Sequence, residues 1–213
     1  HLFGMLILHT GLHHAGINQI DVVDGQQRLT TLSLLLNALK LKFETLGNQY
    51  HVQQIENMLK CGTDEENRKN KLTLGELDNK DYTAILSGNL SQVKNEHLLN
   101  AHDSFISLIN EAIEEQGEGW IKGFYNKLVL TARIIRLDVQ QAKDAYKLFE
   151  TINNRGLRLS ATDILKNFIL GHAAKIGNEK LEEVKNLWST LIVSLDGIST
   201  DDFFRQYITT YNR

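Results

Sequence analysis

The feature that most constrains the fold is a change of hydrophobic period across five polar residues, Asp24 to Arg28 (Asp-Gly-Gln-Gln-Arg). The run before them, 20–23, is rich in β-branched apolar side chains and is typical of a strand. From Leu29 onward, leucines and a phenylalanine recur at spacings of three and four residues, which is the period of one face of an α-helix. The five polar residues therefore lie at a predicted junction between a strand and a helix.

Such a junction favours an anion, because the first N–H groups of a helix have no intrahelical partner and the helix dipole is positive there. Arg28 offers a planar fork of donors to phosphate, and Gly25 lets the backbone come close to a ligand. Asp24 is suited to hold a cation or the arginine, and Gln26 or Gln27 to orient an attacking water. The structural alternative is that Asp24 caps the helix, Gly25 makes the turn and both glutamines face solvent.

A second polar segment, 153–159, separates two predicted helices. Asparagine and glycine commonly end helices, so a plain turn between helices explains Asn153 and Gly156. It does not explain Arg155 and Arg158, which would stand beside the N-terminus of the next helix. Two guanidinium groups at that place predict another corner that attracts anions.

The next helix begins with a predicted capping box, Ser160 to Asp163. Lys166 lies three residues beyond Asp163, so the two side chains share a face of that helix. The alternative to a binding role is a surface salt pair together with a cap.

The remaining pattern predicts a mostly helical chain with a small sheet. The strands 2–8 and 19–23 make a plausible hairpin, and the strand 131–139 could return to it. A loop is expected over 61–70 and a short strand over 71–74. Helices are expected over about 29–46, 48–60, 79–87, 95–115, 120–130 and 142–152, from Ser160, over 181–195, and from Ser199 to Tyr211.

Composition narrows the classes of protein that fit. The formal net charge of -3 gives no global basic field, so any contact with DNA would need a local patch. The single cysteine, Cys61, excludes an internal disulfide and favours a reducing compartment such as the cytoplasm. No apolar stretch reaches the roughly 18 residues that cross a bilayer, so no membrane segment is expected.

Several catalytic and metal-binding patterns are missing from the sequence. His9, His13 and His14 crowd one loop, but no carboxylate has metal-ligand spacing with them, so we predict no metal site. The phosphate-binding loop of nucleotide hydrolases, the zinc-protease helix and the serine-hydrolase elbow are absent. The chain opens within a strand and without an initiator methionine, and we interpret it as a fragment whose upstream part is missing.

The two polar segments together resemble a known family. Residues 22–32 (Val-Val-Asp-Gly-Gln-Gln-Arg-Leu-Thr-Thr-Leu) are similar to the signature of the GmrSD-type restriction enzyme N-terminal domain. Residues 149–166 resemble the second signature of the same family, and residues 3–8 suit the strand that precedes the first. The resemblance covers about residues 1–170.

This resemblance implies an α+β, mostly helical fold, in which a small ParB/sulfiredoxin-like sheet near the N-terminus packs against many helices and is followed by them. It implies a core over 1–140 with a helical insertion, and a helical continuation over 141–213. The implied activity is binding and hydrolysis of a nucleoside triphosphate, with Mg²⁺ as a companion ion, in modification-dependent restriction of phage DNA. A downstream HNH-type nuclease domain or subunit is the implied partner.

Carried over by position, the resemblance assigns catalysis to Asp24, Gln26, Gln27 and Arg28. It assigns nucleotide and phosphate binding to Gly25, Asn153, Arg155, Gly156, Asp163 and Lys166. Two other functions stay open from the residues themselves. One is a non-catalytic module that binds DNA or acts as a scaffold, in which the same arginines hold backbone phosphates. The other is a metal-dependent nuclease, which would need further carboxylates converging on Asp24.

Overall fold

The computed structural model describes residues 1–10, 19–62, 68–153, 160–195 and 198–211, without the side chains of Glu76, Glu150, Asn153 and Tyr211. The chain forms two compact units. Unit 1 contains residues 1–4 and 26–134, and unit 2 contains residues 5–25 and 135–213. The chain passes from unit 2 to unit 1 at the Gly25–Gln26 bond, inside the first polar segment.

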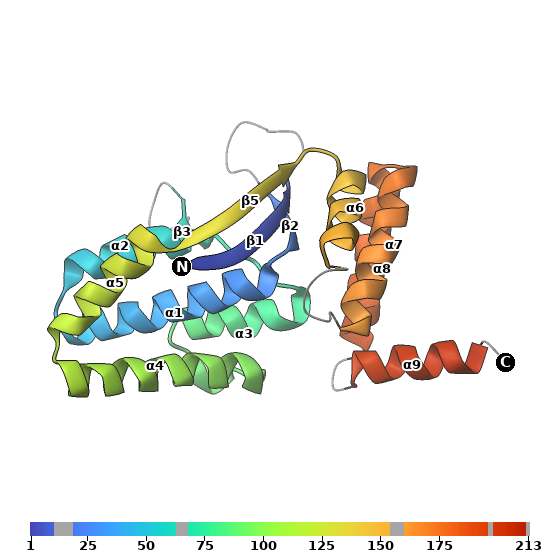
Figure 1. The fold of residues 1–213 in the computed structure, drawn as a ribbon. Coiled ribbons are helices and arrows are strands. Elements are labelled where there is room, and N and C mark those ends of the chain that lie inside the picture. The colour runs from blue at the N-terminus through green and yellow to red at the C-terminus, as the bar shows by residue number, and fades with distance from the viewer. Residues whose placement is uncertain (11–18, 63–67, 154–159, 196–197, 212–213) are drawn as a thin grey trace. The chain divides into compact units, whose positions relative to one another are not determined.

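A small mixed sheet has the strand order β2-β1-β5. β1 (Leu2–His9) pairs with β2 (Asp21–Asp24) in antiparallel fashion, with Ile7 opposite Asp24. β5 (Arg133–Val139) runs parallel to β1, because its first residue bonds to the backbone of His1 and its last to that of Thr10. The predicted hairpin and the predicted return of the third strand are both confirmed (Figure 1).

Unit 1 is built around one long helix. Its elements are α1 (Gln26–Thr45), α2 (Gln49–Leu59), β3 (Lys60–Cys61), β4 (Lys69–Asn70), α3 (Glu76–Leu86), the 3₁₀ turn η2 (Leu90–Gln92), α4 (Glu96–Gln116) and α5 (Gly119–Thr131). α1 packs against α2 and α4, and α4 also contacts α3 and α5. One apolar cluster joins Phe43 of α1 to Ile55 and Ile121, and a second joins Leu34 of α1 to Tyr82. α1 is therefore buried on more than the one face that its leucine spacing indicates.

Unit 2 places a helical layer against the hairpin. Its helices are α6 (Ala142–Asn153), α7 (Ala161–Ile176), α8 (Asn178–Ser194) and α9 (Thr200–Tyr211). α6 packs on β2 and on α7, and α7 contacts α8 and α9. Gly171 of α7 lies so close to α6 that an added Cβ would stand 3.1 Å from the Cβ of Tyr146. α6 and α7 therefore approach closely at a residue without a side chain.

The predicted class, α+β and mostly helical, is confirmed. The predicted strand over 71–74 is wrong, because the strand pair forms earlier, between Lys60–Cys61 and Lys69–Asn70. Lys71 adds one more backbone bond, to the carbonyl of Leu59, before the chain turns inward. Leucines 72 and 74 then pack against the cluster around Tyr82 instead of pairing. Within the described residues, no helix combines the length and the apolar character needed to span a membrane.

Candidate functional site

The first polar segment lies at the predicted strand-to-helix junction. β2 ends at Asp24 and α1 begins at Gln26, three residues before its leucine pattern starts. Gly25 between them is buried and has φ +97°, a conformation that other residues rarely adopt. Gln26 and Gln27 are exposed, and Arg28 is half-buried. The junction therefore turns abruptly and presents the first turn of α1, which contains no acidic residue.

Arg28 lies over a glycine of β1, within unit 1. A Cβ added to Gly4 would stand 3.2 Å from Nε of Arg28 and 3.4 Å from its Cδ. Gly4 also has φ +100°, so both its backbone and its surroundings favour glycine. Our sequence analysis did not single out Gly4. The available signal was a lone glycine inside an apolar strand, which often indicates close approach of another group.

In unit 2, the strand that carries Asp24 and the helix that leads into the second segment share one core. Val23, the residue before Asp24, packs against a cluster formed by Ile7 of β1 and by Ala145 and Phe149 of α6. It also packs against a cluster formed by α6, α7 and α8, whose buried members are Ala142, Tyr146, Leu170, Ala173 and Leu181. The two signatures are therefore packed together at the level of β2 and α6. The side chain of Asn153, together with Arg155, Gly156 and Arg158, lies outside the described residues.

The N-terminus of α7 is capped by the hydroxyl of Ser160 and by the carboxylate of Asp201, and the carboxylate of Asp163 lies in the same turn. Ser160 is the predicted N-cap, and its Oγ accepts from the N–H of Asp163 at 3.0 Å and donates to Oδ2 of Asp163 at 2.8 Å. Asp201 of α9 accepts from the backbone N–H of Thr162 at 3.0 Å and from its hydroxyl. The bonds from Thr162 lower the pKa of Asp201. The corner predicted to attract anions thus already holds negative charge.

Lys166 lies one turn further along α7 and is half-buried. The ammonium of Lys166 makes no hydrogen bond or ion pair with any residue that the structure describes. Burial lowers the pKa of Lys166, the charge of Asp163 opposes this shift, and the positive charge of Lys185 adds to it. The salt pair considered between Asp163 and Lys166 is therefore only a longer-range attraction, and no described residue forms an ion pair with the ammonium of Lys166.

A second charged cluster connects β2 to α8. Nζ of Lys185 lies 2.7 Å from Oδ2 of Asp21 and 2.9 Å from Oε1 of Glu182, and Nδ1 of His9 lies 3.6 Å from the same oxygen of Asp21. Burial alone would raise the pKa of Asp21, but its bond to Lys185 and the charges around it outweigh burial and lower it. Nothing local in the sequence indicates this cluster, because Asp21 and Lys185 are 164 residues apart.

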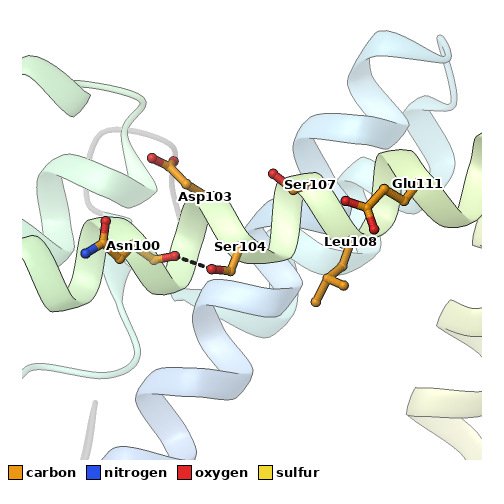
Figure 2. A pocket seen from close by; sticks show the side chains of 6 residues that line it. All are labelled: Asn100, Asp103, Ser104, Ser107, Leu108 and Glu111. Atoms are coloured by element: carbon orange, nitrogen blue, oxygen red, sulfur yellow. Dashed lines mark hydrogen bonds between the residues drawn. The ribbon is translucent and has the colours of Figure 1, made fainter.

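A hollow in the surface of unit 1 has none of the predicted site residues in its lining. Within the described residues, no group of three or more His, Cys, Asp or Glu side chains could hold a metal ion. Figure 2 shows a hollow of unit 1 whose lining comes from α4 alone. The lining residues are Asn100, Asp103, Ser104, Ser107, Leu108 and Glu111. None of them is a predicted site residue.

The structure places the first signature at a strand-to-helix junction and packs its strand, β2, on α6, where the second signature begins. Comparison with protein families identifies the same family that the two signatures indicate. The chain belongs to the family described as the GmrSD restriction endonuclease, N-terminal domain, which matches residues 1–170. This match confirms the family that the two signatures indicate. No curated protein shows significant similarity to the chain. α8, α9 and the last turns of α7 lie beyond the matched residues.

Proposed function

We propose that the chain is the nucleotide-binding and nucleotide-hydrolysing regulatory domain of a modification-dependent restriction protein that acts on DNA in anti-phage defence. The family supports the restriction part of this proposal. Hydrolysis of a nucleoside triphosphate, action on DNA and a nuclease partner are the finer parts, and they rest on the chemistry of the first polar segment.

The observation that carries the proposal is the placement of Arg28 at the first turn of α1. That turn has no acidic side chain, and its N–H groups add to the positive charge of the guanidinium. The stem of Arg28 crosses the bare backbone of Gly4, so the guanidinium is held in a limited range of positions. A preorganised cation beside a helix N-terminus is suited to stabilise the charge of a phosphoryl group during transfer.

The other predicted residues take roles that their chemistry allows. Asp24 would hold the Mg²⁺ that accompanies the nucleotide, and Gln26 or Gln27 would orient the attacking water. Lys166 would bind phosphate as a point charge, since its ammonium has no direct ion pair within the described part of the chain. Phosphate contacts are also proposed for Gly25, Asn153, Arg155 and Gly156, and a contact with the nucleotide away from its phosphates is proposed for Asp163, because a carboxylate repels phosphate.

The test is steady-state NTP hydrolysis by the full-length protein and two variants. We expect Arg28→Ala to lower kcat/KM by roughly 100-fold, the size of effect seen when a preorganised donor to a reacting oxyanion is lost. Arg205→Ala removes a well-exposed arginine of α9 and should leave turnover unchanged. Unchanged hydrolysis in a folded Arg28→Ala variant would remove Arg28 from the mechanism.

A wild-type protein without NTPase activity would refute the enzymatic proposal itself. In that case, DNA affinity measured over a range of salt concentrations tests the non-catalytic alternative. Phosphate contacts by these arginines would make that affinity fall steeply with salt.

A further inference from the structure

We propose that Lys185 of α8 is a positioning residue, which fixes the strand that ends in Asp24 by binding Asp21 at the start of the same strand. The activity part of this inference rests on the proposed NTPase function. Lys185 lies outside the residues that match the family, so the family signatures do not assign it a role.

Lys185 connects α8 to β2 through its ion pair with Asp21, and we call this connection the tie. Its ammonium bonds to Asp21 at 2.7 Å while also holding Glu182 of its own helix at 2.9 Å. The side chain of Lys185 is only 27% exposed, which restricts its freedom, whereas that of Asp21 is 51% exposed, so solvent screens the pair in part. Nδ1 of His9 in β1 lies 3.6 Å from the same oxygen of Asp21, so the cluster contains residues from both strands of the hairpin.

Apolar contacts support the same tie. Leu181 of α8 belongs to the cluster against which Val23 of β2 packs, and Val184, next to Lys185, packs against the same cluster. β2 is therefore held to the helical layer by Val23 near its end and by Asp21 at its beginning. Tyr146 lies within this cluster with 6% of its surface exposed, and this burial raises its pKa to about 12.

The short length of β2 makes the tie matter for Asp24. The strand has four residues, so a shift at Asp21 is carried to Asp24 with little chain in between to absorb it. A displacement of about 1 Å in a group that holds a metal ion or a phosphate can cost a large part of the rate. Lys185 itself does not need to touch the nucleotide, so its loss should act on kcat more than on KM.

α8 offers a matched control. Lys180 also forms an ion pair one turn along α8, to Glu183 at 2.8 Å, but this pair lies within the helix and does not reach β2. Lys180→Met and Lys185→Met therefore remove the same charge and the same kind of intrahelical contact. Only Lys185→Met removes a contact with the strand.

The experiment combines NTPase kinetics with hydrogen exchange of the β2 amides in the full-length protein. We expect Lys185→Met and Asp21→Asn each to lower kcat by about fivefold with little change in KM, in the range that one partly exposed ion pair can supply. The double variant should be no worse than either single variant, because both remove the same contact. Lys185→Arg should restore kcat, and Lys180→Met should match the wild type.

Hydrogen exchange separates this proposal from the proposed function. Faster exchange of the β2 amides in Lys185→Met, but not in Lys180→Met, supports the tie even if the protein hydrolyses no nucleotide. Unchanged exchange in Lys185→Met overturns the tie. Additive losses of kcat in the double variant, or a loss of kcat that Lys185→Arg does not restore, overturn the positioning role.

Discussion

Replacing Gly4 with alanine tests how Arg28 is held. The substitution forces a residue with a Cβ into φ +100°, which costs about 1–3 kcal/mol of backbone strain. The new Cβ would stand 3.2 Å from Nε of Arg28, so that side chain must move by a few tenths of an ångström. Leaving a preferred rotamer costs a further ~1 kcal/mol. Part of this is offset by about 0.4–1 kcal/mol, because alanine has less freedom than glycine in the unfolded chain.

The net expectation for Gly4→Ala is a loss of about 1–3 kcal/mol in the free energy of unfolding. Chemical denaturation measures this loss, and two other glycines of unit 1 calibrate it. Gly88 has φ +79° and no atom within 4 Å of an added Cβ, so Gly88→Ala should cost the backbone part alone. Gly123 lies inside α5 with open space around it, so Gly123→Ala should stabilise by about 1 kcal/mol.

The contribution of Arg28 is isolated by repeating Gly4→Ala in the Arg28→Ala background. If the stem of Arg28 opposes the new methyl group, the cost of Gly4→Ala should fall by about 1 kcal/mol in that background. In the proteins that retain Arg28, the alanine should also lower NTP turnover more than Gly88→Ala does. The reasoning is refuted if Gly4→Ala costs the same with and without Arg28, since the glycine would then serve the backbone alone.

Three further predictions concern unit 2. Gly171→Ala should destabilise by about 1–2 kcal/mol in denaturation experiments despite the better helix propensity of alanine, because its Cβ would stand 3.1 Å from that of Tyr146. Burial raises the pKa of Tyr146 to about 12, so the folded state keeps a proton that the unfolded state releases above pH 10. The free energy of unfolding should therefore fall by about 2–3 kcal/mol as the pH rises from 10 toward 12. The Tyr146→Phe variant should lose less stability over that range. Because the pKa of Asp21 is lowered, its pair with Lys185 stabilises the protein fully above pH 3.8 and weakens as the pH falls below that value. The stability of Asp21→Asn should therefore depend less on pH in this acid range than that of the wild type.

The sequence predicted those parts of the fold that local pattern determines. The hairpin, the long helix after Arg28, the cap at Ser160 and the turn at Gly25 each depend on a few neighbouring residues, and the structure has them at or near the expected places. The strand expected over 71–74 failed because short apolar runs satisfy a strand and a buried loop equally well. The domain division at residue 140 and the roles of the predicted site residues stay predictions.

The features that the sequence did not predict are contacts between distant residues. Lys185 meets Asp21 across 164 positions, and Asp201 caps α7 from 39 residues away. Charged side chains of this kind look like ordinary solvated residues in a sequence, because nothing in their spacing indicates which partner folding brings near. Gly4 is different, since a lone glycine in an apolar strand is a visible signal that another group approaches the backbone closely.

The two helix N-termini that the sequence marked as anion sites differ in charge, and this difference ranks them. The first turn of α1 contains Arg28 and no acid, whereas the first turn of α7 contains Asp163 and is also capped by Asp201. A phosphate at the N-terminus of α7 would have to displace a carboxylate that already accepts two hydrogen bonds, whereas the first turn of α1 contains no acidic residue. We therefore propose that Lys166, one turn inside the helix, is better placed to bind phosphate than the backbone N–H groups at the start of α7.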